Sequence, residues 1–210
     1  MAQGYCGTVK SRMYHLIGTL TAGPIGRLFR FKSKGEENLP RDGGYVLAAN
    51  HMSNLDPWPL GIPLYPKRQL RFMAKAELYF PPLGWILNSA GAFPIQRGTG
   101  DEGAVKRAIE LAQAGEVVAI FPEGTRRNKG KKTRKARPRS GAARVALAAG
   151  VPLVPAAIGG TERLSRLGPL RVAYGPPVEL DDLRDLDIRR SSKIATGRLM
   201  EAIHDLEKTL

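Results

Sequence analysis

Short apolar segments bounded by glycine or proline alternate with helical patterns along this 210-residue chain, and this alternation limits the folds open to it. The predicted strands are residues 45–49, 70–74, 92–95, 117–121, 151–158 and 172–174. The predicted helices include residues 85–89, 102–114, 141–149 and a C-terminal amphipathic segment marked by Leu199, Ile203, Leu206 and Leu210. Such an order predicts a single α/β domain in which helices cover a mostly parallel or mixed sheet.

An amphipathic segment, residues 1–35, precedes the main domain of residues 36–210. Met13, Leu16, Ile17 and Leu20 fall on one helical face, and Gly23-Pro24 is expected to end that helix. Apolar residues flanked by Lys and Arg suit a helix that lies in a membrane interface, but packing on the domain's own core explains them equally well. No apolar run is long enough to predict a membrane-spanning helix.

The net charge of +14 comes from 33 Lys and Arg against 19 Asp and Glu. Nine of the fourteen residues from Arg126 to Arg139 are basic and none is acidic. Such a surface attracts nucleic acid, anionic lipid headgroups or acidic carrier proteins. The basic run contains no aromatic residue that could stack on bases, which disfavours nucleic acid. A single cysteine, Cys6, cannot form an internal disulfide, so a reducing cytoplasmic setting is expected.

Three loops that follow predicted strands contain polar and reactive side chains. They are residues 50–56, Gln96-Arg97 and residues 123–126. Ligands of open α/β sheets tend to bind beyond the carboxyl ends of the strands, so these loops are the candidate site. Arginine can bind phosphate through two hydrogen bonds, although a solvated surface charge is the usual role of a single arginine.

The first of these loops contains His51 and, five residues later, Asp56. Histidine suits proton transfer near neutral pH, and a carboxylate that holds its tautomer makes it a better base. Alternatively, His51 lies at a surface turn and Asp56 only caps the helix that begins at Pro57. Ser53 is close to His51 but lacks a glycine-rich nucleophile turn, so a substrate hydroxyl is expected to attack directly. No Cys or His cluster has the spacing of a metal site.

Four ordered motifs resemble those of the 1-acylglycerol-3-phosphate acyltransferase family, also called PlsC-like. They are Asn50-His51-x-Ser53-x-x-Asp56, Phe93-Pro-Ile-Gln-Arg97, Phe121-Pro-Glu-Gly-Thr-Arg126 and Val151-Pro-Leu-Val-Pro155. The resemblance covers about residues 39–177. It implies the glycerophosphate acyltransferase fold, with His51 as general base and Asp56 as its orienting carboxylate. The substrate-binding residues that we expect from these motifs are Asn50, Ser53, Arg97, Glu123, Gly124, Thr125 and Arg126. Pro155 and its strand would shape the site.

The resemblance also implies a reaction. A fatty acyl group would pass from acyl-CoA or acyl carrier protein to the hydroxyl of lysophosphatidic acid, giving phosphatidic acid, with no metal or cofactor. The acceptor could instead be glycerol 3-phosphate or another lysophospholipid, and a nucleic-acid-binding protein is the remote alternative. We expect a monomeric cytoplasmic enzyme attached peripherally to an anionic membrane surface. The short N-terminal segment and the unusually basic run depart from many family members, which leaves the acceptor open.

Overall fold

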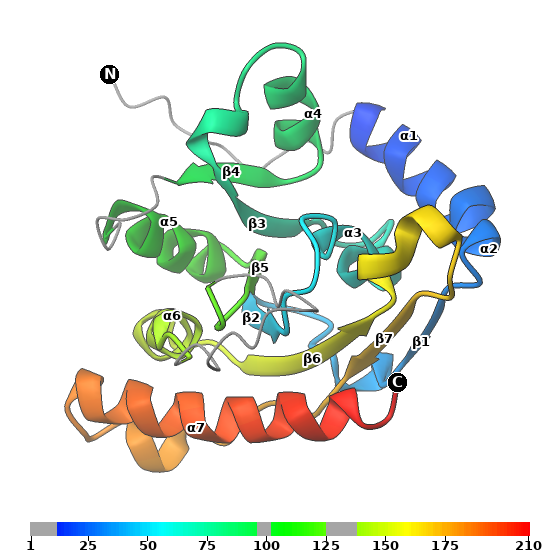
Figure 1. Cartoon of the computed structure of the whole chain (residues 1–210). Helices are drawn as coiled ribbons and strands as arrows, with labels where there is room; N and C mark the ends of the chain where they lie inside the picture. Colours follow the sequence, from blue (N-terminus) through cyan, green and yellow to red (C-terminus); the bar gives the residue numbers. More distant parts are fainter. Residues whose placement is uncertain (1–11, 96–101, 125–137) are drawn as a thin grey trace.

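The computed structural model describes residues 12–95, 102–124 and 138–210 (Figure 1). Its strands are β1 (Lys32–Lys34), β2 (Tyr45–Ala49), β3 (Leu70–Lys75), β4 (Ala92–Ile95), β5 (Val117–Ile120), β6 (Leu153–Gly159) and β7 (Arg171–Tyr174). Its α-helices are α1 (Arg12–Leu20), α2 (Gly26–Leu28), α3 (Pro57–Gly61), α4 (Leu83–Ser89), α5 (Glu102–Gln113), α6 (Gly141–Ala149) and α7 (Ile188–Glu207). The predicted α/β fold is therefore confirmed.

The strands form one sheet in the order β1-β7-β6-β2-β5-β3-β4. Neighbours from β6 to β4 run parallel, whereas β7 runs antiparallel to β6 and pairs in parallel with β1. The central strands β2 and β5 are fully buried and wholly apolar, as strands covered on both faces should be. The carboxyl ends of β6, β2 and β5 consequently lie side by side at one edge of the sheet.

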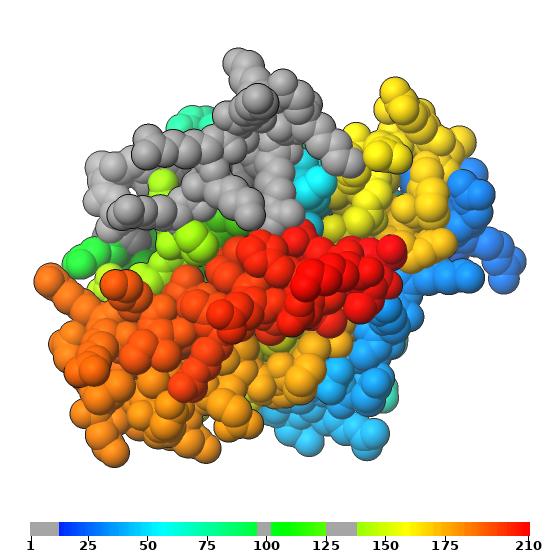
Figure 2. All heavy atoms as spheres, turned by 60° about the horizontal axis from the view of Figure 1, so that its bottom comes forward, coloured from blue at the N-terminus to red at the C-terminus, as the bar shows by residue number. Residues whose placement is uncertain are grey.

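Helices cover both faces of this sheet. One apolar core lies between the sheet and α5, α6 and α7, and alanines of α6 allow close packing there. The other core includes Leu60 of α3 and side chains from the opposite faces of β2, β5, β6 and β7. Helix α7 begins at the cap Asp187, whose carboxylate accepts main-chain N–H groups of Arg189 and Arg190. Figure 2 shows α7 lying across the middle of the face that is turned to the viewer.

The N-terminal segment differs from its prediction in two respects. Helical structure does not end at Gly23-Pro24, because Thr21–Ile25 forms a π-helical turn that includes Pro24 and leads into α2. A π turn relaxes the hydrogen-bond ladder, and so it can accommodate a proline that an α-helix would exclude. The chain then enters β1, a strand that the sequence did not predict. With the sequence Lys-Ser-Lys, β1 is a polar edge strand, and its pattern contains no apolar signal.

Helix α1 contacts the body of the protein through Tyr14 and Gly18, which are buried, while Met13, Leu16 and Leu20 are about half exposed. The Tyr14 hydroxyl donates to the carbonyl of Arg68, and the Tyr65 ring lies against Gly18. The apolar face predicted from the sequence is thus turned largely to the outside. Within the described residues, no helix combines the length and the apolar character needed to cross a membrane.

Candidate active site

The candidate site is the edge of the sheet where β2, β5 and β6 end. The loop of residues 50–56, here called the catalytic loop, leaves β2, which lies between β5 and β6. Phe121 to Gly124 follow β5, and Gly160 and Thr161 follow β6. Parallel pairing brings three segments that are far apart in the sequence to one place (Figure 1).

His51 and Asp56 meet within the catalytic loop, as the sequence predicted. The Nδ1 atom of His51 lies 2.7 Å from Oδ2 of Asp56. Asp56 is 0% exposed and His51 is 7% exposed, so both residues are buried. Because an ionised carboxylate only accepts hydrogen bonds, this contact places the proton on Nδ1. The other ring nitrogen, Nε2, is then able to take a proton from a hydroxyl.

The prediction that Asp56 precedes a helix beginning at Pro57 is confirmed, but the capping hydrogen bond expected of its side chain is absent from that described helix, α3. The reason lies in the sequence of α3, because Pro57 and Pro59 have no N–H and the N–H of Trp58 donates to the carbonyl of Leu55. The carboxylate instead turns back and accepts the N–H groups of Met52 and Ser53 at 2.7 Å and 2.9 Å.

The ring of Phe121 stacks on His51, with 4.4 Å between ring centroids and 20° between planes. Phe121 begins the motif that follows β5, but no pattern in the sequence predicted its contact with His51. A flat apolar neighbour limits rotation of the imidazole and leaves its edge, with Nε2, as the polar part. Together, Asp56 and Phe121 hold the ring from its Nδ1 side and from one face.

Two residues of the catalytic loop serve its conformation in this structure. The buried amide of Asn50 donates to the carbonyl of Ile158 at 2.9 Å and accepts the N–H of the same residue at 2.8 Å. The hydroxyl of Ser53 accepts the N–H of Leu55 at 3.3 Å. Asn50 therefore fastens the loop to β6, and the contacts with substrate that the sequence predicted for both residues remain predictions.

The segment after β5 contributes Glu123, which is buried, and Gly124, which has φ of +65°. A Cβ atom at Gly124 would lie 2.8 Å from Nε of Arg139, so the arginine side chain passes directly over this glycine. Arg97, Thr125 and Arg126 lie outside the described residues. Pro155 is buried inside β6 opposite Ala48, away from the end of the strand.

Thr161 belongs to the site and was missed by sequence analysis. Its hydroxyl lies 2.5 Å from Oδ1 of Asp56, the carboxylate oxygen that does not contact His51. A signal for it existed, because Gly160 and Thr161 follow an apolar strand just as the other site loops do. The prediction used three such loops and did not consider this fourth one.

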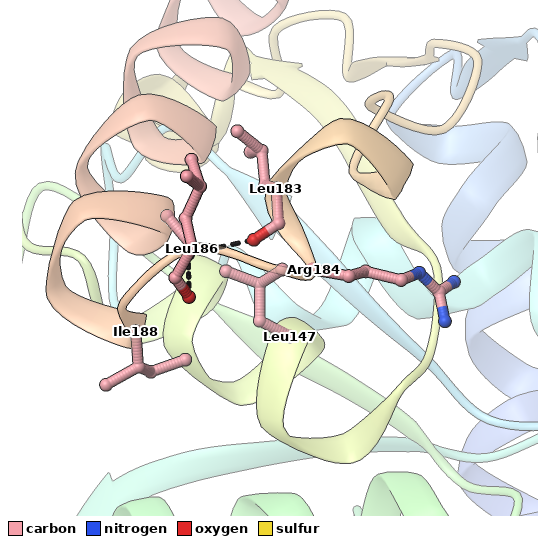
Figure 3. A pocket seen from close by; sticks show the side chains of 6 residues that line it. Leu147, Leu183, Arg184, Leu186 and Ile188 are labelled. Atoms are coloured by element: carbon pink, nitrogen blue, oxygen red, sulfur yellow. Dashed lines mark hydrogen bonds between the residues drawn. The ribbon is translucent and has the colours of Figure 1, made fainter.

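A hollow elsewhere on the molecule does not extend this site. It is lined by Leu147, Leu183, Arg184, Leu186, Ile188 and Ser191 (Figure 3). The hydroxyl of Ser191 lies within hydrogen-bonding distance of the carbonyls of Leu183 and Leu186. Because its lining comes from α6, from the start of α7 and from the residues just before α7, the hollow is a packing junction between these elements. Among the residues of the described ranges, no three His, Cys, Asp or Glu side chains are grouped to hold a metal ion.

Known proteins that resemble this chain are acyltransferases. A family model described as "Acyltransferase" matches residues 30–159. A 1-acyl-sn-glycerol-3-phosphate acyltransferase of Bacillus subtilis is 33% identical over 85% of this chain and 89% of its own length. A lyso-ornithine lipid O-acyltransferase of Pseudomonas aeruginosa is 42% identical over 52% of this chain and 41% of its own. The fold is similar to the crystal structure of PlsC, the 1-acyl-sn-glycerophosphate acyltransferase of Thermotoga maritima, with a TM-score of 0.61 and 21% identity over 92% of this chain and 93% of that one.

Proposed function

Because this chain belongs to the acyltransferase family and is an O-acyltransferase, we propose that it transfers a fatty acyl group from a thioester to the free hydroxyl of lysophosphatidic acid. The observation that carries the proposal is the buried His51–Asp56 pair, which leaves Nε2 of His51 as the base of the site. The product would be phosphatidic acid, which is used in phospholipid synthesis. The acyl donor is acyl-CoA or acyl carrier protein, and no metal or cofactor takes part.

The reaction proceeds in one displacement. Nε2 of His51 takes the proton of the acceptor hydroxyl as its oxygen attacks the thioester carbonyl carbon. The carbon–sulfur bond then breaks, and the thiolate leaves with the proton returned by His51. Asp56 stabilises the imidazolium between these two proton transfers. No residue of the enzyme needs to be acylated, and the hydroxyl of the half-buried Ser53 accepts the N–H of Leu55 in a simple turn.

The phosphate of the acceptor is assigned to the positive residues of two motifs. In the sequence, Arg97 comes two residues after the end of β4 and Arg126 comes two residues after Gly124. Strands β4 and β5 run in the same direction as β2, the strand that leads to His51. A guanidinium can bind a phosphate through two hydrogen bonds. Arg97→Ala and Arg126→Ala should therefore raise KM for the acceptor more than KM for the donor. The opposite pattern would reverse the two ends of the proposed site.

Activity assays with a panel of lipids identify the acceptor. Purified protein is assayed with lysophosphatidic acid, glycerol 3-phosphate, a zwitterionic lysophospholipid and lyso-ornithine lipid, each with acyl-CoA and with acyl carrier protein as donor. We expect the highest kcat/KM with lysophosphatidic acid. A higher kcat/KM with lyso-ornithine lipid would mean that the acceptor is the lipid named for the Pseudomonas relative and not lysophosphatidic acid.

The same assay tests the base. His51→Ala should lower kcat by at least about 10²-fold, because a general base contributes about 10²- to 10⁴-fold. The His204→Ala variant is the matched control, since His204 is exposed on α7. More than a tenth of wild-type activity in His51→Ala, with His204→Ala unaffected, would refute the mechanism.

Membrane attachment is the second part of the proposal. Helices α1 and α4 contact each other (Figure 1). Both carry exposed apolar side chains, Leu16 and Leu20 on α1 and Trp85 and Ile86 on α4. Trp85 is 73% exposed. We call these four residues the apolar face. Exposed arginines of α2 and its end, Arg27 and Arg30, can contact anionic headgroups near it. An apolar face with cations beside it is the pattern of an interfacial attachment.

Vesicles of phosphatidylglycerol and phosphatidylcholine test this attachment. Wild-type protein should co-sediment with them and its Trp85 fluorescence should shift to the blue, and Leu16→Ser with Leu20→Ser should weaken both effects. Leu167→Ser is the matched control, because Leu167 is also about half exposed but follows β6 instead. Equal binding by all three proteins would exclude the apolar face.

The basic run is tested separately by neutralising Lys129, Lys131, Lys132, Arg134 and Lys135 together. Weaker vesicle binding with normal turnover of a short-chain acceptor would assign the run to the membrane. A raised KM for the carrier-linked donor alone would assign it to acyl carrier protein. If neither measurement changes, the run has no part in either interaction.

A further inference from the structure

The carboxylate of Asp56 is surrounded by hydrogen-bond donors from two different parts of the chain. Oδ2 accepts from the ring of His51 and from the N–H groups of Met52 and Ser53. All three belong to the catalytic loop itself. Oδ1 accepts from the hydroxyl of Thr161 at 2.5 Å, and this donor lies 105 positions away in the sequence. Of the donors found for the Asp56 carboxylate among the described residues, Thr161 alone comes from outside the loop.

Thr161 is placed by the end of β6. Gly160 has φ of +96°, and a Cβ atom there would collide with the carbonyl oxygen of Pro169, so only glycine fits this sharp turn. Thr161 follows at the start of a short 3-10 helix and is 3% exposed. The same end of β6 is held to the catalytic loop by the two hydrogen bonds between Asn50 and Ile158. The backbone that carries Thr161 is therefore held in place, and this fixes the position of its hydroxyl.

From this arrangement we infer that Thr161 is a positioning residue for the His51–Asp56 pair, an inference that rests on the proposed function. A buried carboxylate oxygen without a donor is costly, because it has lost its hydration. Asp56 is 0% exposed, so without Thr161 its Oδ1 would have to turn toward another donor. Rotation of the carboxylate would move Oδ2 away from Nδ1 of His51. The threonine hydroxyl thus fixes the direction in which the histidine is held.

Two substitutions at Thr161 separate the hydroxyl from the shape of the side chain. Thr161→Val keeps the shape and removes the donor, whereas Thr161→Ser keeps the donor. Thr161→Val should lower kcat about 10- to 100-fold, as expected for loss of a hydrogen bond to a charged group. KM for acceptor and donor should stay near wild type, because Thr161 touches neither substrate in the proposed mechanism. Thr161→Ser should restore most of kcat.

A double substitution tests whether Thr161 acts through Asp56. In an Asp56→Asn background, Thr161→Val should cause much less than its single-variant loss of kcat, since the charged carboxylate through which Thr161 acts is already absent. Full additivity of the two losses would mean that Thr161 acts elsewhere. Thermal melting of each variant shows whether a loss of kcat comes from a loss of folded protein.

The imidazole itself gives a readout that does not need turnover. The chain has three histidines, so the ring Nδ1–H signal of His51 in the NMR spectrum can be assigned with His51→Ala. Thr161→Val should shift this signal and Thr161→Ser should leave it near its wild-type position. If the wild type transfers no acyl group but the signal shifts as expected, the proposed function fails and the positioning role stands. If the wild type is active while Thr161→Val keeps both its kcat and the signal, the positioning role is refuted.

Discussion

At the scale of single residues, the catalytic loop is held mainly by its own polar side chains. Asn50 bonds to the N–H and the carbonyl of Ile158, and the Asp56 carboxylate accepts the N–H groups of Met52 and Ser53 beside the ring of His51. Such a loop has little freedom to move, and a base works best when its position is set before the substrate arrives. The site therefore uses ordinary loop hydrogen bonds to prepare a chemical group.

Asn50→Ala should reveal this bracing. The substitution leaves the N–H and the carbonyl of Ile158 without their partner in a buried place, which should cost at least about 2 kcal/mol of unfolding free energy. Ser53→Ala is the matched control in the same loop, because its hydroxyl accepts a single bond near the surface. Denaturant unfolding measures both. If Asn50→Ala leaves the unfolding free energy unchanged and raises KM for the acceptor, Asn50 contacts the substrate, as the sequence predicted.

At the scale of elements, α1 is attached to the domain by the ring of Tyr65. The Tyr65 hydroxyl bonds to Thr19 at 2.8 Å and to the carbonyl of His15 at 3.2 Å, and its ring lies against Gly18. The close approach needs a residue without a side chain at position 18. This attachment sets the direction in which α1 presents Leu16 and Leu20, and so it connects the packing of one helix with the proposed membrane contact.

Gly18→Ala should loosen this helix. A Cβ atom at position 18 would collide with the Tyr65 ring, which two hydrogen bonds hold in place, so helix or ring must move. Gly23→Ala is the matched control, because no atom lies within 4 Å of a Cβ atom there. Limited proteolysis within α1 should be faster for Gly18→Ala only, with a lower Tm. Equal cleavage of the two variants would show that the Tyr65 contact does not hold α1.

At the scale of the whole molecule, the domain depends on buried tyrosines that stay neutral. Burial raises the pKa of Tyr45 to about 12, with a smaller opposing effect of the Arg68 guanidinium, and burial raises the pKa of Tyr174 well above its ordinary value. Above about pH 10 the unfolded chain loses tyrosine protons that the folded chain keeps. This contribution to stability is therefore complete below about pH 10 and is lost as the pH rises through about 12.

Tyr45→Phe should make the protein less sensitive to alkali. Its hydroxyl is buried with no hydrogen-bond partner among the described residues, so Tm at neutral pH should stay equal or rise. Tyr174→Phe is the contrasting variant, since the Tyr174 hydroxyl donates to the carbonyl of Leu60 at 2.8 Å and its loss should cost about 1 kcal/mol at neutral pH. Melting curves from pH 7 to 11 measure both effects. An alkaline loss of stability in Tyr45→Phe as steep as in wild type would contradict this account.

The sequence by itself determined the features that local pattern controls. Apolar runs between glycines predicted β2 and β4 with their observed bounds, and an alanine-rich stretch predicted α6. The pairing of His51 with Asp56 was also accessible, because both residues lie in one short loop between a strand and a helix start. The four motifs then identified the family, which the relatives confirm.

Only the tertiary structure decided the contacts between distant segments. Thr161 with Asp56, Asn50 with Ile158 and Phe121 with His51 join residues that no period or spacing relates. Strand β1 escaped prediction because a polar edge strand needs no apolar pattern. The capping hydrogen bond expected of Asp56 is absent because Pro57 and Pro59 of the described helix α3 have no N–H to donate and the N–H of Trp58 donates to Leu55. Local pattern determines where a strand or helix forms, but the order of strands in the sheet determines which loop ends meet, and that order depends on packing across the whole chain.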